Sequence, residues 1–70
     1  MQIVGKVIRV LDHGTIVQVV LEQDDGRPYF INFDHRPFAH FAESESFSGV
    51  GDVLTVEIDD DGNEYVEVIG

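Results

Sequence analysis

The sequence predicts a small all-β domain. Apolar and polar residues alternate with period two over much of the chain, as in GKVIRVLDHGTIVQVV at residues 5–20, and β-branched residues are frequent in these runs. Both features are typical of strands with one buried face. No amphipathic helical stretch of ten or more residues stands out. We therefore expect a sheet with little helix.

Five strands are expected, each bounded by turn residues. They span residues 2–11, 15–22, 28–33, 53–58 and 64–69. The first two are joined by Asp12-His13-Gly14, and the last two by Asp60-Asp61-Gly62-Asn63. Asp-Gly and Gly-Asn pairs are strong hairpin signals because glycine takes the positive φ of tight turns. Pro28 can open the third strand without losing a needed ladder bond.

The segment between the third and fourth strands predicts the one helical element. Pro37 can occupy the first turn of a helix, and Phe38 and Phe41 are spaced i, i+3 on one side of it. We expect one or two helical turns that plug the open end of a small barrel. A mobile loop from about Glu43 to Gly51 should follow, because this stretch is rich in Ser, Glu and Gly.

The order of the elements favours one barrel fold over another. Three strands in a meander, a helical connection and then a hairpin is the order of the OB-fold, a five-stranded barrel. We therefore expect residues 1–70 to form a single OB-fold-like β-barrel domain. An SH3-like barrel is the alternative, but it would place its long excursion after the first strand.

Length and charge restrict the classes of function. With 70 residues, 43% of them apolar, and no cysteine, the chain has room for one domain and no disulfide framework. The net charge is −10, yet all four bases lie in residues 1–36, whereas residues 37–70 hold nine acids and no base. This asymmetry predicts two faces with different partners. The alternative is that acidity only keeps a small β domain soluble.

The N-terminus predicts a cytoplasmic protein. MQIVGKVIRV carries a lysine and an arginine inside its apolar run and lacks a small-residue cleavage site, unlike a signal peptide. No segment approaches the roughly 20 apolar residues that a membrane span requires. We expect no membrane partner.

Three segments resemble a known RNA-binding family. GKVIRVLDHGTIVQV, FINFD and GVGDVLTVEIDDDG are similar to the OB domain named after the largest protein of the bacterial small ribosomal subunit. The resemblance covers nearly the whole chain and implies that His13, Ile16 and Asn32 lie on a nucleic-acid face. Relatives often carry aromatic residues at the first two of these positions and a histidine at the third.

Alternation along the strands assigns the two faces of the sheet. Val17, Val19 and Leu21 should point inward, as should Tyr29, Ile31 and Phe33. Ile16, Val20 and Phe30 should then form an outer apolar patch, with Asn32 beside it. The expected ligand face comprises Lys6, Arg9, His13, Ile16, Phe30, Asn32 and Arg36. A second copy of the chain could instead cover this patch, so a homodimer is an open alternative.

No motif indicates an enzyme, a cofactor or a metal site. His35 and His40 are five residues apart, not the four that place two imidazoles on one helical face. The acids of residues 59–64 lack the spacing of an EF-hand and fit a solvated turn. Ser44, Ser46 and Ser48 have no base at a meaningful spacing.

Two hypotheses of function follow. The first is a module that binds single-stranded RNA or DNA through the second and third strands. Its alternative is an acidic protein-interaction module, or nucleic-acid mimic, that docks on a basic partner, with a homo-oligomeric structural subunit as a further possibility.

Overall fold

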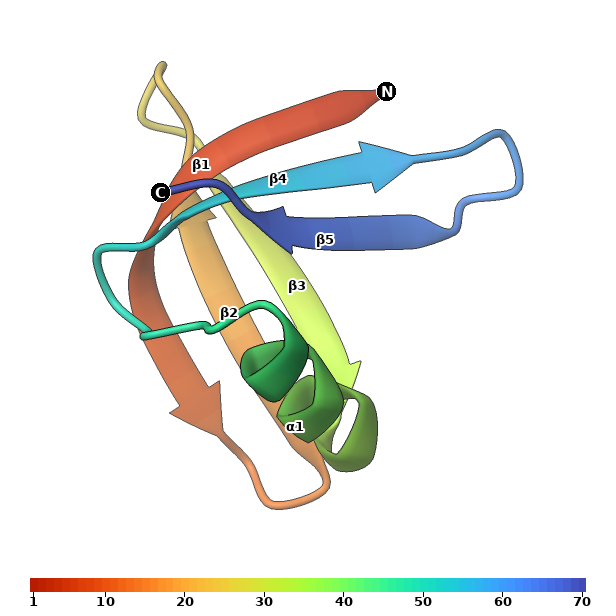
Figure 1. Ribbon diagram of the computed structural model, residues 1–70. Coiled ribbons are helices and arrows are strands. Elements are labelled where there is room, and N and C mark those ends of the chain that lie inside the picture. The colour runs from red at the N-terminus through yellow and green to blue at the C-terminus, as the bar shows by residue number, and fades with distance from the viewer.

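The computed structural model describes residues 1–70 as five antiparallel strands and one helix (Figure 1). The elements are β1 (Gln2–Asp12), β2 (Ile16–Glu22), β3 (Pro28–Asp34), α1 (His35–Ser44), β4 (Val53–Ile58) and β5 (Glu64–Val68). They form one sheet in the order β3-β2-β1-β4-β5. The predicted all-β class and the five strands are confirmed, and each strand end differs by at most one residue from the prediction.

β1 belongs to both halves of the sheet. Its first part, Gln2 to Lys6, pairs with β4, and its second part, Lys6 to Asp12, pairs with β2. The strand curves strongly between these partners (Figure 1). Gly5 lies at this crossing, where an added Cβ would be 2.8 Å from the Leu21 Cβ. A side chain at Gly5 would therefore push β1 and β2 apart.

A β-bulge in β1 resets the alternation of its side chains. Val7 pairs with Leu21 and Arg9 with Val20, so Ile8 is the extra residue. Val7 and Val10 are three positions apart, so strict alternation would place them on opposite faces. Both nevertheless pack on the core. Because of the bulge, Lys6 and Arg9 lie on the same, outer face of the sheet.

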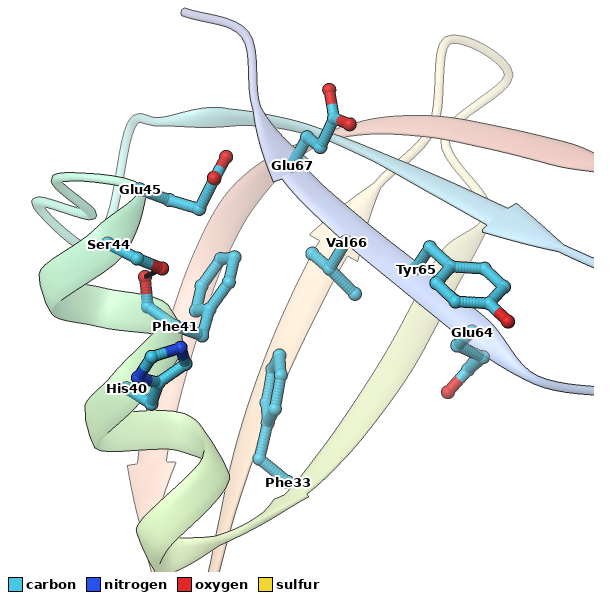
Figure 2. Close-up of a pocket in the computed structure, with 9 residues that line it drawn as sticks. All are labelled: Phe33, His40, Phe41, Ser44, Glu45, Glu64, Tyr65, Val66 and Glu67. Atoms are coloured by element: carbon cyan, nitrogen blue, oxygen red, sulfur yellow. Dashed lines mark hydrogen bonds between the residues drawn. The ribbon is translucent and has the colours of Figure 1, made fainter.

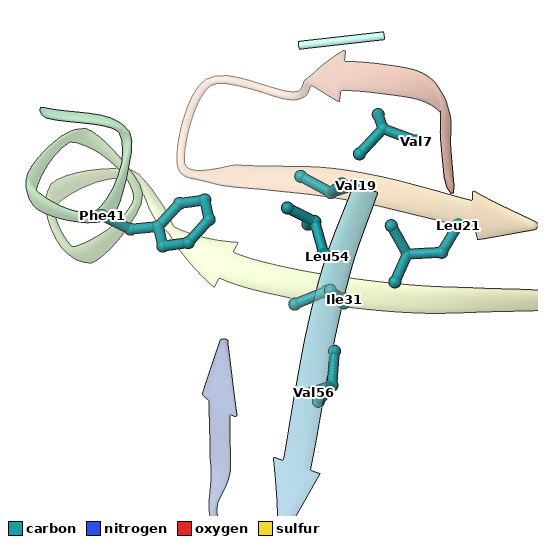
Figure 3. Packing of buried hydrophobic residues seen from close by; sticks show 7 residues of the cluster. All are labelled: Val7, Val19, Leu21, Ile31, Phe41, Leu54 and Val56. Atoms are coloured by element: carbon teal, nitrogen blue, oxygen red, sulfur yellow. The ribbon is translucent and has the colours of Figure 1, made fainter. Parts of the chain in front are cut away.

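The core lies between the two halves of the sheet (Figure 3). It comprises Val7, Val19, Leu21, Ile31, Phe41, Leu54 and Val56. Every one of the residues predicted to point inward on β2 is buried, and Ile31 of β3 is buried as well. Tyr29 and Phe33 are half-buried and pack against this cluster. The predicted assignment of inner faces on β2 and β3 is confirmed.

The helix is longer than predicted. α1 spans ten residues and includes Glu43 and Ser44, which belong to the segment predicted as a loop. Phe38 and Phe41 do share one side: Phe41 stacks on Phe33 of β3 with ring centroids 5.1 Å apart, and Phe38 meets Phe47 at 5.9 Å. This aromatic packing stabilises the apolar side of an amphipathic ten-residue helix, which was not expected from the sequence. Packing of such a side supplies most helix stability in proteins. α1 is too short and too polar to cross a membrane.

β3 and β5 form the two edges of the sheet. No backbone ladder joins them, so the sheet is not closed and the predicted barrel stays a prediction. A side-chain hydrogen bond spans the gap, in which the Tyr29 hydroxyl donates to the Glu64 carboxylate. Burial, then this hydrogen bond and the charge of Glu64, raise the pKa of Tyr29 to about 12.

Candidate nucleic-acid interface

The outer surface of β1, β2 and β3 is organised in rows across the strands. Directly paired residues of an antiparallel sheet point to the same face, so the register defines each row. The three rows are Lys6–Glu22–Pro28, Arg9–Val20–Phe30 and Leu11–Gln18–Asn32. Four of the seven predicted ligand residues therefore occupy adjacent rows of one face.

The middle row places an aromatic ring and a guanidinium on either side of one valine. Phe30 is 52% exposed, so its ring is open to solvent. Val20 is only 6% exposed, and the expectation that it forms part of an open patch is wrong. It stands outside the core cluster and is flanked on both neighbouring strands by the larger side chains of Arg9 and Phe30.

Ile8 takes the place of Val20 as an exposed apolar group beside this row. The bulge sets Ile8 and Arg9 together opposite Val20, and Ile8 is 46% exposed. Strict alternation assigns Ile8 to the outer face but Arg9 to the inner one. No sequence signal marks the bulge, because neither glycine nor proline stands at this point of β1.

The next row presents two amides. The Gln18 side-chain nitrogen Nε2 donates to Oδ1 of Asn32 over 3.2 Å. This bond holds the two groups side by side at the surface, where Asn32 is exposed. A paired amide still has donors and acceptors to offer, which is the capacity needed to read the edge of a base.

The β1–β2 turn lies next to the start of α1. The His35 backbone N–H donates to the Thr15 carbonyl over 3.0 Å, and His35 Nε2 lies 4.0 Å from Oδ2 of Asp12. His13 and Arg36, each adjacent in sequence to one of these residues, are therefore at the same end of the β1–β3 face. Ile16 is 41% exposed and pairs with Asp34 at this end.

The cations of this face are not engaged in ion pairs. The salt bridges of the protein are Arg27 with Asp25 at 3.4 Å and the long contact of His35 with Asp12. Lys6, Arg9 and Arg36 have no such partner, which leaves them able to meet phosphates. Glu22 lies in the row of Lys6, so the positive charge is concentrated toward Arg9.

The acidic β4–β5 turn is held together by one of its carboxylates, that of Asp59. Asp59 Oδ1 accepts the backbone N–H groups of Asp61 and Asn63, each over 2.9 Å. The bond from the Asn63 backbone is the main cause that lowers the pKa of Asp59. No group of three or more His, Cys, Asp or Glu side chains is placed to hold a metal ion.

No protein-family model, no curated protein and no solved structure matches this chain. The chemistry of the β1–β3 surface is therefore the basis for a functional conclusion.

Proposed function

We propose that the protein is a non-enzymatic OB-like barrel domain that binds single-stranded RNA or DNA on the outer surface of β1, β2 and β3. One observation carries the proposal: the exposed ring of Phe30 shares a row with the unpaired guanidinium of Arg9, directly beside the Gln18–Asn32 amide pair. The resemblance to ribosomal-type OB domains supports the same surface.

The barrel part of the proposal rests on the strand order. An order of β3-β2-β1-β4-β5 leaves β3 and β5 as the only strands that could close the sheet, as they would in an OB-fold. The Tyr29–Glu64 hydrogen bond already links these two edges. Figure 1 shows the β4–β5 hairpin crossing over β2 and β3, in keeping with a barrel.

Each side chain has a distinct part in such a complex. Phe30 stacks on one base, an interaction worth about 1–3 kcal/mol. Arg9, Lys6 and Arg36 neutralise backbone phosphates. Asn32, oriented by Gln18, hydrogen-bonds a base edge, while His13 stacks or hydrogen-bonds at the turn and Ile16 adds apolar area. Binding should tolerate many sequences, since stacking and phosphate contacts do not discriminate strongly between bases.

The acidic half of the chain, residues 37–70, lowers the affinity that we expect for nucleic acid. Nine carboxylates lie in residues 37–70, which form most of α1 and all of β4 and β5. With a net charge of −10, long-range repulsion opposes the approach of a phosphate backbone. We expect weak binding that is best seen at low salt.

Fluorescence anisotropy with a labelled single-stranded oligonucleotide of mixed sequence tests this proposal. Phe30→Ala should weaken binding roughly 5- to 150-fold, which corresponds to the loss of one stacked base. Tyr65→Ala is the matched control, because Tyr65 is 57% exposed but lies on β5 in the acidic half. Equal losses for both variants, or no binding of the wild type at low salt, would contradict the proposal.

The cations are tested separately through the salt dependence. Each of Lys6→Gln and Arg9→Gln should reduce the slope of log K against log salt by about 0.7, the contribution of one neutralised phosphate on a single strand. Arg27→Gln is the control, since Arg27 already pairs with Asp25. A slope unchanged in the first two variants would remove these residues from the interface.

A further inference from the structure

A groove lies between α1 and β5, on a different surface from the β1–β3 face (Figure 2). Its volume is about 410 Å³. Phe33 at the end of β3 and Phe41 of α1 point into it, and Val66 of β5 faces them from the other side (Figure 2). The floor is therefore apolar, and one wall is the free edge of a strand.

That edge offers backbone groups that no neighbouring strand pairs with. In the β4–β5 ladder, Asp59 N–H donates to the Asn63 carbonyl and Ile69 N–H to the Val53 carbonyl, so odd-numbered residues of β5 face β4. By the alternation of an antiparallel pair, Glu64, Val66 and Val68 turn their N–H and C=O groups to the open side. The Glu45 carboxylate accepts the Val68 N–H over 3.1 Å, which confirms this direction.

Glutamates surround the groove, and no lysine or arginine lines it. Glu45, Glu64 and Glu67 are at its rim, with His40 as the only basic side chain. A second copy of the chain is a poor occupant, because it would bring the same glutamates and a further charge of −10 to this edge. A phosphate backbone is repelled for the same reason. A cationic occupant is complementary.

We propose that the α1–β5 groove binds an extended basic peptide, which adds a strand to the free edge of β5. Strand addition draws affinity from backbone hydrogen bonds and specificity from alternate side chains. The peptide pairs with the backbone of Val66, places an apolar side chain against Phe33 and Phe41, and directs lysine or arginine side chains to the glutamates. Strand addition uses the β5 edge that is open in this sheet and therefore excludes closure of β5 against β3. Nucleic-acid binding on the outer face of β1, β2 and β3 does not need that closure, so either proposal can fail alone.

The direct test is amide chemical-shift mapping on the full chain, titrated with a capped octapeptide of alternating lysine and valine. Shifts should concentrate on Glu64, Val66 and Phe41. Two control peptides separate the sources of affinity: one has glutamate in place of lysine, and one carries N-methyl groups on alternate backbone nitrogens. Both should bind far more weakly. Equal binding of the N-methylated peptide would overturn strand addition.

A matched pair of variants tests the charge of the groove. Glu45→Gln keeps an oxygen that can accept the Val68 N–H but removes the charge, and it should weaken binding of the lysine–valine peptide about twofold to fivefold, as expected for one ion pair near the surface. Glu43→Gln makes the same change two residues away on α1, outside the groove, and should leave binding unchanged. Equal effects of the two variants would overturn the site, as would light scattering that shows a stable dimer through β5 in the free protein.

Discussion

At the scale of single residues, Gly5 is where the fold has no room for a side chain. An added Cβ would lie 2.8 Å from the Leu21 Cβ and 3.0 Å from the Glu22 carbonyl oxygen. Gly5→Ala should therefore lower the free energy of unfolding by about 1–3 kcal/mol, the usual penalty of overpacking. Urea unfolding measures this loss. In the control Gly70→Ala, the nearest atom is 3.6 Å away, so the change should stay within about 0.5 kcal/mol.

Phe41 and Phe30 should differ in how much they contribute to the free energy of unfolding. Phe41 is 8% exposed and packs on Phe33 and Phe47, so Phe41→Ala should destabilise the protein by about 3–5 kcal/mol. Phe30→Ala also removes a phenyl ring, but Phe30 is 52% exposed, so the change should alter stability by less than about 1 kcal/mol. Comparable losses in urea unfolding would mean that Phe30 is part of the core, which would remove it from the ligand face.

The identity of the outward side chains could be predicted only in part. Ile16 and Phe30 are exposed as expected, because a period of two holds along β2 and β3. Alternation does not predict the burial of Val20, which depends on the size of its cross-strand neighbours, or the outer position of Arg9, which depends on a bulge. Neither property is local in sequence.

At the scale of elements, the two edges of the sheet are linked by one hydrogen bond that depends on pH. Burial first, and then the hydrogen bond to Glu64 and its charge, raise the pKa of Tyr29 to about 12, so folding favours the neutral phenol, the form that donates to Glu64. This contribution is complete below the unfolded value near 10 and is lost as pH rises from there toward about 12. Urea unfolding at a series of alkaline pH values should therefore show an extra loss of stability in the wild type.

Tyr29→Phe should lack that extra loss, because it keeps the ring but has no hydroxyl to titrate. If the variant and the wild type lose stability in parallel between pH 10 and about 12, the Tyr29 hydroxyl does not have the buried, Glu64-bonded environment of this structure in solution.

The elements themselves were predictable to different degrees. Strands follow from alternation and from Asp-Gly turns, which are local signals. The length of α1 was not predictable, because its last residues are held by Phe38, Phe41 and Phe47 on a surface that only the assembled sheet provides. Whether β3 and β5 pair to close the sheet likewise depends on tertiary packing and not on a local sequence signal.

At the scale of the whole molecule, the uneven charge of the sequence becomes a division in space. The free cations Lys6 and Arg9 lie on the β1–β3 face with Phe30, whereas the groove at α1 and β5 carries Glu45, Glu64 and Glu67. Opposite ligands suit these two surfaces, a polyanion for the first and a cationic peptide for the second. The sequence predicted the asymmetry but not the groove, which forms from residues distant along the chain.

The most direct test of the central claim, that the outer face of β1, β2 and β3 binds single-stranded nucleic acid, is chemical-shift mapping of the labelled chain with a short oligonucleotide at low salt. We predict shifts at Ile16, Phe30 and Asn32 that fade as salt is added. Unchanged spectra at low salt, or shifts confined to α1 and β5, would contradict it.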